Sequence, residues 1–358
     1  MSKFFNTKYK TLVPYTPGEQ PRERQYVKLN TNESPFPPLK KAVREAKRVS
    51  ARTNLYSDPE MIKLREAIAK RYGVSENMVI ITNGSDEVLN FAFMSYCDDE
   101  RPALFPNITY GFYPVFANLA GVPFKTFALD ENFKIDITPY IETAGTPFIA
   151  NPNAPTGIAL SVEEIEKIIT SNPDRVVVVD EAYVDFGAES VVPLTLKYDN
   201  LLVTQTFSKS RSMAGARLGF GIANEKIISD LNTVRYSTNP YNVNSMTLAM
   251  GKAVIENDDY TKKNCKAIEK NREWTTRELE KLGFMTTPSL ANFIFARHPD
   301  MSGEKIYKAL REKGVLVRHF TAPEICEYNR ITVGSAKQMR ALVLALSEIL
   351  EENNEKRY

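Results

Sequence analysis

Short apolar segments alternate with amphipathic segments along most of the chain. The apolar segments, each expected to be a strand, are Val79–Thr82, Ala103–Phe105, Phe124–Ala128, Phe148–Ala150, Val176–Asp180, Leu201–Thr206 and Gly219–Ile222. Helical spacing predicts helices at Leu39–Arg48, Ile62–Tyr72, Asp86–Tyr96, Tyr110–Ala120 and Ser161–Thr170. Because parallel strands need a crossover connection, usually a helix, this order predicts an α/β fold with a mostly parallel central sheet covered by helices.

After Ser245 the pattern changes to long helices and a compact α+β tail. The expected elements are helices Met246–Glu256 and Tyr260–Leu282, strand Phe293–Ala296, helix Glu304–Lys313, strands Val315–Arg318 and Arg330–Val333, and helix Ala336–Glu351. A chain of 358 residues exceeds one ordinary core. We therefore expect a large domain at residues 40–258, a smaller α+β domain at 259–358, and an N-terminal arm at 1–39 that folds against the smaller domain.

Composition and charge argue against several classes of protein. Lysine plus arginine number 46 against 44 aspartate plus glutamate, without a long basic run, so nucleic acid is not an expected partner. No apolar stretch is long enough to span a bilayer, and the first ten residues lack the apolar core of an export signal. Three widely separated cysteines predict a reduced interior and a cytoplasmic location. With only two histidines, neither a histidine-rich metal site nor a Ser-His-Asp triad is expected.

One lysine lies in a setting that is unusual for a surface residue. Lys209 stands between Ser208 and Ser210, directly after the apolar segment that ends at Phe207, and Arg217 follows between two glycines. A lysine removed from water loses part of its proton affinity and becomes a nucleophile toward a carbonyl carbon. The hydroxyls and Arg217 supply donors suited to a phosphate. Pyridoxal 5'-phosphate, a carbonyl compound with a phosphate group, satisfies both requirements; a solvated loop that closes a strand is the alternative.

Two other expected strand ends carry polar groups. Gly84, Ser85 and Asp86 follow the strand Val79–Thr82 and open a helix, where free backbone N–H groups can receive a phosphate. An ordinary strand–helix turn with Ser85 or Asp86 as the cap is the alternative. Asp180 ends a central strand, which is where open α/β sheets bind ligands. Its carboxylate could keep a pyridine nitrogen protonated, or it could simply cap the next helix.

The Ser-Lys pair followed by Gly-x-Arg-x-Gly resembles the lysine motif of fold-type I pyridoxal-phosphate aminotransferases. The resemblance implies that Tyr110 stacks on the pyridine ring and that Tyr183 hydrogen-bonds the phenolic oxygen; half-buried packing is the alternative for Tyr110. The family motif Asn-Pro-Thr-Gly is altered, since Ala154 stands at the asparagine position and Asn153 precedes it. Either Asn153 reaches the phenolic oxygen from one residue earlier, or the contact is lost.

Within fold type I, the chain is most similar to histidinol-phosphate aminotransferases. The segments that carry this resemblance are Val13–Tyr15, Leu29–Pro35, Tyr56–Pro59, Pro240–Asn244, Gly314–Arg318 and Arg330–Gly334. It implies transfer of the amino group of histidinol phosphate to 2-oxoglutarate, giving glutamate, with Lys209, Asp180 and Tyr183 as catalytic residues.

The same resemblance assigns the remaining site residues. Tyr56 would reach the cofactor phosphate of the neighbouring subunit in a homodimer. Arg330, assisted by Arg318, would bind the α-carboxylate of glutamate in one half-reaction and the phosphate of histidinol phosphate in the other. The residues expected to line the substrate pocket are Tyr15, Asn32 and Tyr241. Surface ion pairs are the alternative for the two arginines, and simple packing is the alternative for the pocket residues.

Three other hypotheses stay open on this scaffold. The chain could be an aromatic amino-acid aminotransferase or resemble a threonine-phosphate decarboxylase, and rates with phenylalanine and threonine phosphate separate these hypotheses from the first. It could also be a non-catalytic binding protein, which would stay colourless when cofactor is added. The presence of Asp180, Lys209 and Arg217 together argues against the binding protein.

Overall fold

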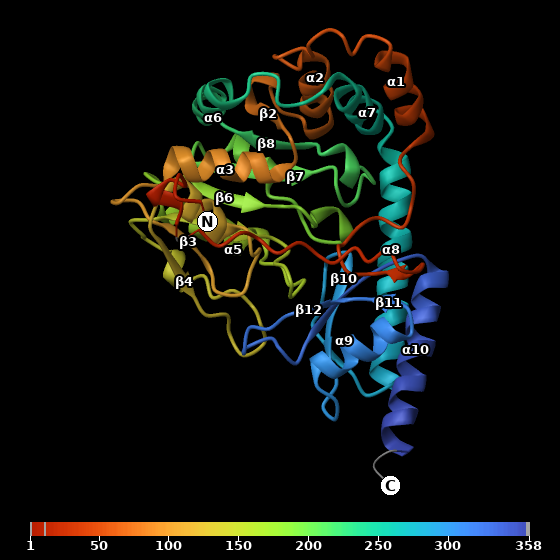
Figure 1. The fold of residues 1–358 in the computed structure, drawn as a ribbon. Coiled ribbons are helices and arrows are strands. Elements are labelled where there is room, and N and C mark those ends of the chain that lie inside the picture. The colour runs from red at the N-terminus through yellow and green to blue at the C-terminus, as the bar shows by residue number, and fades with distance from the viewer. Residues whose placement is uncertain (1, 11, 356–358) are drawn as a thin grey trace.

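The computed structural model describes residues 2–10 and 12–355, and its main element is a sheet of seven strands (Figure 1). The strands are β2 (Val79–Thr82), β3 (Ala103–Pro106), β4 (Phe124–Phe127), β5 (Thr146–Ala150), β6 (Val177–Asp180), β7 (Leu201–Thr206) and β8 (Gly219–Ala223). Their order across the sheet is β2-β8-β7-β6-β5-β3-β4. Of these seven, β8 alone runs antiparallel to the other six. The predicted fold class, with a mostly parallel central sheet, is confirmed.

Seven α-helices accompany this sheet among the described residues. They are α1 (Lys40–Ser50), α2 (Ile62–Tyr72), α3 (Ser85–Tyr96), α4 (Tyr113–Ala120), α5 (Val162–Ser171), α6 (Glu225–Thr238) and α7 (Ser245–Ile255). The predicted start of α4 at Tyr110 is wrong, because residues 110–112 form a turn and the helix begins with Tyr113 and Pro114. Proline favours the first helical turn because it has no N–H to leave unpaired. Helix α6 was not among the predicted helices.

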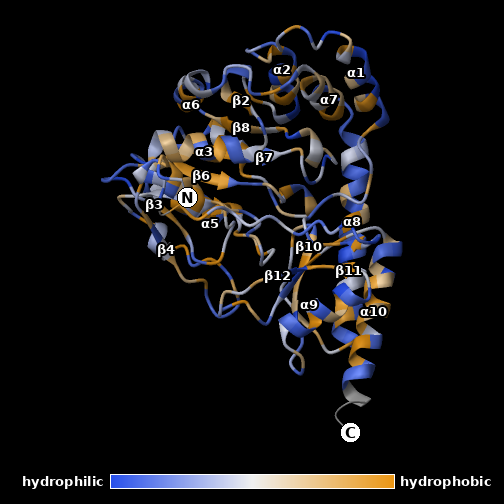
Figure 2. Ribbon diagram, in the orientation of Figure 1, coloured by the Kyte–Doolittle hydropathy of each residue, from blue (hydrophilic) through white to orange (hydrophobic). Residues whose placement is uncertain are grey.

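Alternate residues of the central strands enter two different cores. Val177 and Val179 pack with residues of α2, α5 and α7 on one face of the sheet, while Val178 packs with residues of α3, α4 and α6 on the other. This division follows from the strand geometry, in which successive side chains point to opposite faces. In Figure 2 the ribbons of β6 and β8 carry orange, apolar residues, whereas those of α1 and α8 alternate between blue and orange. A strand that is apolar on both faces therefore requires helices on both sides.

The C-terminal part forms a second sheet with its own helices. Its elements are α8 (Asp258–Lys281), β9 (Met285–Thr286), β10 (Phe293–Arg297), α9 (Gly303–Glu312), β11 (Val315–Leu316), β12 (Arg318–His319), β13 (Asn329–Thr332) and α10 (Ala336–Glu355). The antiparallel order is β12-β13-β10-β9. The single strand predicted at Val315–Arg318 is wrong. Buried Val317 separates β11 from β12, and the two strands pair with different partners.

The N-terminal arm contacts both parts of the molecule. Strand β1 (Val27–Lys28) runs parallel to β11, and Leu29 packs into the C-terminal core. Lys8, near the start of the arm, donates to the carbonyl oxygen of Ala120 at the end of α4. Helix α7 ends at Ile255 and α8 begins at Asp258, between the two cores. These contacts support the domain division that we propose, with the arm at 1–39 and a boundary near residue 258; residues 1, 11 and 356–358 lie outside the described part.

Candidate active site

A cavity of about 190 Å³ lies where the carboxyl ends of β5, β6 and β7 meet. Parallel neighbours end at the same edge, so Asp180 at the end of β6 and Lys209 just after β7 come together there. The residues that line the cavity are Ser85, Asp86, Tyr110, Ala150, Pro152, Ala154, Asp180, Ala182, Tyr183, Thr206, Ser208, Lys209 and Arg217. Eight residues predicted from separate motifs therefore meet in one cavity.

The Lys209 amine lies between the N-terminal arm and Tyr183. Nζ of Lys209 donates to the carbonyl oxygen of Thr31 at 3.2 Å and lies 5.8 Å from the centroid of the Tyr183 ring. The amide of Asn32 donates to the Tyr183 hydroxyl at 2.9 Å, and Thr332 donates to the other end of that amide at 3.1 Å. Asn32 is therefore fixed beside the lysine and orients Tyr183.

Asp180 is almost fully enclosed, with 4% of its surface exposed. Its carboxylate accepts the backbone N–H of Ala182 at 3.2 Å, and the hydroxyl of Tyr113 donates to it at 3.4 Å. Burial raises the pKa of Asp180 to about 7, and the neighbouring Asp86 adds to the rise. A cation held against this carboxylate would favour its ionised form, which is the environment a protonated ring nitrogen requires.

Arg217 lines the cavity beside the start of α3. Its Nη1 donates to Oγ of Ser208 at 3.2 Å, and its Nη2 donates to Oδ2 of Asp86 at 3.1 Å. The hydroxyl of Tyr110 donates to the other oxygen of Asp86 at 2.7 Å. Helix α3 begins at Ser85, so its free N–H groups lie beside the guanidinium. Donors from an arginine, a serine and a helix N-terminus fit a phosphate group.

Replacing Gly84 by alanine is expected to weaken cofactor binding. A Cβ atom at Gly84 would lie 2.7 Å from Nη2 of Arg217, and its φ of +81° disfavours any side chain. Displacing one charged donor should raise the Kd for pyridoxal phosphate by roughly 10- to 100-fold. The matched control is Gly215→Ala, since a Cβ there meets nothing within 4 Å. Equal Kd values for both variants, measured by absorption titration of the cofactor-free protein, would contradict the assignment of this phosphate site.

Asn153 does not line the cavity, contrary to one of the two alternatives predicted for it. Its amide nitrogen donates to the carbonyl oxygen of Ile108 at 2.9 Å, and its amide oxygen accepts the hydroxyl of Thr109 at 2.7 Å. The side chain is completely buried, and Ala154 lines the cavity in its place. Because both ends of the amide are used within the chain, the geometry favours loss of the direct contact to the phenolic oxygen.

Two arginines lie beside the arm, near the cavity. Nη2 of Arg330 donates to the carbonyl oxygen of Asn30 at 3.1 Å, while its buried Nε has no acceptor among the described residues. Burial lowers the pKa of Arg330, and the nearby Tyr183 and Tyr15 oppose that effect. Arg318 donates to the backbone carbonyls of residues 16 and 17. A buried guanidinium with a free donor is suited to an anion.

Tyr56 and Tyr241 lie apart from this cavity and contact each other. The rings of Tyr56 and Tyr241 stack on each other with centroids 4.4 Å apart, and 82% of Tyr56 is exposed. Tyr56 instead borders a groove of about 690 Å³ along α1 and α7. The ring of Tyr15, a predicted pocket residue, has its centroid 4.8 Å from that of Phe112 and faces the turn that carries Tyr110. The chain by itself therefore leaves Tyr56 and Tyr241 unconnected to Lys209.

Sequence reasoning missed Tyr113 as a partner of Asp180. Tyr113 is fully buried at the start of α4, and its hydroxyl contacts the carboxylate from a position sixty-seven residues earlier in the chain. In sequence it belongs to an apolar run with Pro114, Val115 and Phe116, so it is indistinguishable from a core residue. No local signal separates the two roles.

The fold and this cavity define a pyridoxal-phosphate-dependent enzyme of fold type I. Residues 24–346 match the family "Aminotransferase class I and II". Histidinol-phosphate aminotransferase 1 of Bradyrhizobium diazoefficiens is 47% identical over 350 residues, covering 98% of this chain and 100% of the relative. Histidinol-phosphate aminotransferase of Clostridium beijerinckii is 44% identical over 355 residues, covering 99% of both.

Among solved structures, histidinol-phosphate aminotransferase from Sinorhizobium meliloti in complex with pyridoxal-5'-phosphate has a TM-score of 0.89 at 22% identity, covering 98% of this chain and 99% of that one. The chain belongs to the class I and II aminotransferases and, within them, to the histidinol-phosphate aminotransferase family. It is an aminotransferase, and its cofactor is pyridoxal 5'-phosphate. No helix of residues 2–10 and 12–355 is both long and apolar enough to cross a bilayer.

Proposed function

We propose that this enzyme transfers the amino group of histidinol phosphate to 2-oxoglutarate, giving imidazole acetol phosphate and glutamate in histidine biosynthesis. The observation that carries the proposal is the meeting of Lys209, Asp180 and Arg217 in one cavity, in a chain 47% identical to a histidinol-phosphate aminotransferase. The buried free donor of Arg330 supplies a site for the substrate's anionic group.

The chain's residues have separable tasks in this reaction. When bound, pyridoxal phosphate supplies a ring that accepts the electron pair released at the substrate's Cα. Arg217, Ser208 and the N-terminus of α3 hold its phosphate, and Asp180 holds a proton at the ring nitrogen. The amine of Lys209 takes the proton from Cα as a general base and delivers it to the C4′ carbon of the cofactor as a general acid.

Two aromatic residues complete the proposed cofactor site. Tyr183 donates to the phenolic oxygen, and the amide of Asn32 fixes the direction of its hydroxyl. Tyr110 stacks on the ring, and its hydroxyl is anchored to Asp86. These hydrogen bonds from Asn32 and to Asp86 restrict the orientations of the two tyrosine rings before substrate binds. The site therefore needs less reorganisation during the reaction.

Replacing Arg330 by methionine is expected to raise the KM for histidinol phosphate by roughly 10- to 100-fold, because a charged hydrogen bond to the substrate is lost. The cofactor absorption band should persist, since Arg330 is not among the residues that line the cofactor cavity. Arg277→Met is the control, because Arg277 is exposed on α8. An unchanged KM for both histidinol phosphate and glutamate would remove Arg330 from the substrate site.

Absorption titration separates the candidate substrates. Low concentrations of histidinol phosphate should replace the yellow absorption band of the holoenzyme by that of the amine form of the cofactor. Phenylalanine should cause the same change only at much higher concentrations. Conversion by phenylalanine alone would favour an aromatic aminotransferase. Release of carbon dioxide from threonine phosphate would favour the decarboxylase, and a protein that stays colourless with added cofactor would be a binding protein.

We further propose a homodimer in which Tyr56 reaches the cofactor phosphate of the partner subunit. Leu55 and Tyr56 are exposed apolar residues that line the groove along α1 and α7, and exposed apolar patches commonly mark protein interfaces. Tyr56→Phe should then raise the Kd for pyridoxal phosphate in the dimer. We also propose a cytoplasmic location, supported by three unpaired cysteines.

A further inference from the structure

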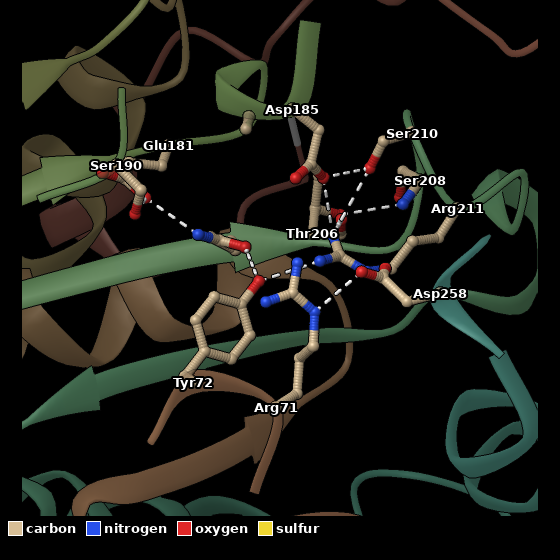
Figure 3. A network of polar contacts seen from close by, with 12 residues as sticks. Arg71, Tyr72, Glu181, Asp185, Ser190, Thr206, Ser208, Ser210, Arg211 and Asp258 are labelled. Atoms are coloured by element: carbon tan, nitrogen blue, oxygen red, sulfur yellow. Dashed lines mark hydrogen bonds and ion pairs between the residues drawn. The ribbon is translucent and has the colours of Figure 1, made fainter. Parts of the chain in front are cut away.

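A buried polar network joins the loop that carries Lys209 to the segment after β6 (Figure 3). Its centre is Arg211, which is 3% exposed. Nη1 of Arg211 donates to Oδ2 of Asp185 at 3.0 Å, and its Nη2 donates to the hydroxyl of Tyr72 at 2.8 Å. The guanidinium therefore bridges two groups that belong to different segments of the large domain.

The contact between Arg211 and Asp185 connects residues that lie close in sequence to Lys209 and Tyr183. Ser210, directly after Lys209, donates its hydroxyl to the same Asp185 oxygen at 2.5 Å. Asp185 lies in the 3-10 helix Val184–Phe186, which directly follows Tyr183. One carboxylate oxygen thus holds two consecutive residues of the lysine loop against the segment that presents Tyr183.

The contact between Arg211 and Tyr72 continues through further hydrogen bonds to the end of β6. The hydroxyl of Tyr72 donates to Oε1 of Gln205 at 2.5 Å, and the amide of Gln205 donates to Glu181 at 2.8 Å. Glu181 also accepts the hydroxyl of Ser190 and is the residue after Asp180. Arg211 is consequently linked by hydrogen bonds to the immediate neighbours of both Lys209 and Asp180.

The lysine loop needs such external support. Ser212 and Arg217 both adopt positive φ values, +56° and +52°, which are unfavourable for residues with a side chain. Strained residues of this kind persist only where surrounding contacts fix them. Ser212 itself contacts Ser34 of the arm through its hydroxyl at 2.8 Å. The network around Arg211 is therefore a source of the constraint that sets where the Lys209 amine lies.

We propose that Arg211 is a positioning residue for Lys209. Its guanidinium fastens the loop that presents the amine to the segment that presents Tyr183 and, through Tyr72, to the end of β6. The inference deepens the proposed function, because it assumes the role given there to Lys209.

Stability of the fold alone does not require an arginine at this position. A buried ion pair stabilises a fold weakly, and an apolar residue of similar volume often serves as well or better. Arg211 also leaves its Nε without an acceptor among the described residues, which is unfavourable for a buried donor. Its planar fork, by contrast, suits the simultaneous contact with Asp185 and Tyr72.

The test measures how fast Lys209 captures the cofactor, which does not depend on turnover. Cofactor-free protein is mixed with pyridoxal phosphate, quenched with borohydride at timed intervals, and digested, and the modified Lys209 peptide is quantified by mass spectrometry. Arg211→Met should lower the capture rate by about 10-fold or more, as expected when a reacting group is displaced. The same variant should lower kcat while the KM for histidinol phosphate changes by less than about 3-fold.

Two further variants show whether the effect is specific. Arg211→Lys should recover only part of the rate, because an ammonium cannot reproduce the two-pronged contact. Arg71→Met is the control, since Arg71 pairs with Asp258 at 2.8 Å within the same region but joins α2 to α8. Its capture rate should equal that of the unaltered protein.

The outcomes are distinguishable. Wild-type capture by Arg211→Met, or an equal loss in Arg71→Met, would overturn the proposal even if the melting temperature fell. If Arg211→Met does not fold, Tyr72→Phe decides the matter, because it removes one anchor and should slow capture without unfolding the chain. If the unaltered protein captures the cofactor at Lys209 but does not act on histidinol phosphate, the proposed substrate fails while the comparison of capture rates still stands.

Discussion

Replacing Lys209 by alanine is expected to lower kcat/KM for amino transfer by about 10⁴-fold. Lys209 is the one lysine among the described residues that line the cavity, so no other lysine there can move the proton at Cα. Its Nζ lies against Thr31 and the Tyr183 ring, which places the amine between the arm and the cofactor position. Cofactor can still bind through Arg217 and α3, so binding and turnover should separate.

Rapid-mixing absorption spectroscopy with histidinol phosphate would measure this loss in a single half-reaction. Lys125→Ala is the control, because Lys125 is exposed on the edge strand β4, and it should retain full activity. Added methylamine should restore part of the rate in Lys209→Ala, as a small amine can occupy the vacated space. Substantial transamination by Lys209→Ala without added amine would refute the role given to this residue.

Replacing Asp180 by asparagine is expected to lower kcat by roughly 10²- to 10³-fold. The change keeps the size of the side chain but removes the charge that holds a proton at the ring nitrogen. Because the carboxylate is buried, water cannot substitute for it. The KM should change less than kcat, since the lost interaction strengthens as charge develops in the ring. Glu131→Gln, at an exposed position, is the control and should leave kcat unaltered.

The same variant should alter how the stability of the cofactor-free protein depends on pH. Burial raises the pKa of Asp180 from 3.8 to about 7, so its neutral form is favoured in the fold. The resulting stability is fully present below pH 4 and is lost as pH rises through about 7, by roughly 4 kcal/mol. Asp180→Asn should remove that part of the loss, whereas Glu181, whose pKa burial also raises to about 7, should still contribute to the loss in the variant.

Urea unfolding of the cofactor-free protein between pH 5 and pH 8 measures this effect. Wild-type protein should lose more unfolding free energy over that range than Asp180→Asn. Parallel curves for the two proteins would show that Asp180 ionises normally, and would remove the electrostatic reason for its role. Saturating cofactor should flatten the wild-type curve, because a cation at the ring nitrogen favours the ionised carboxylate.

Local sequence was sufficient for the elements whose periodicity is unbroken. The bounds predicted for β2, β7 and α2 agree with the structure at every residue, because their apolar spacing and the stop at Gly73 act within the segment itself. Local sequence predicted the wrong start for α4, where the Tyr-Pro pair sets a later start. It also predicted one strand across Val317, where the chain passes from one sheet to another. Pairing depends on partners elsewhere in the chain, so the reversed direction of β8 was equally invisible.

For the site, the sequence by itself determined which chemistry was present and at which strand ends it stood. Lys209, Asp180 and Arg217 follow or end strands of a predicted parallel sheet, so their meeting follows from topology. Only the tertiary structure decided which way loop side chains point. It turned Asn153 toward Ile108 and left Ala154 at the cavity, and it brought Asn32 to Tyr183 from 151 residues away.

Arg211 is the clearest example of a side chain whose partners the sequence did not predict. Beside Lys209 in sequence it is one more cation in a polar loop, yet in the fold it is buried between Asp185 and Tyr72. Strand periodicity is a local property of the backbone, and it fixes where a segment ends. The partner of a loop side chain is instead set by packing between distant segments, and that information exists only once the chain is folded.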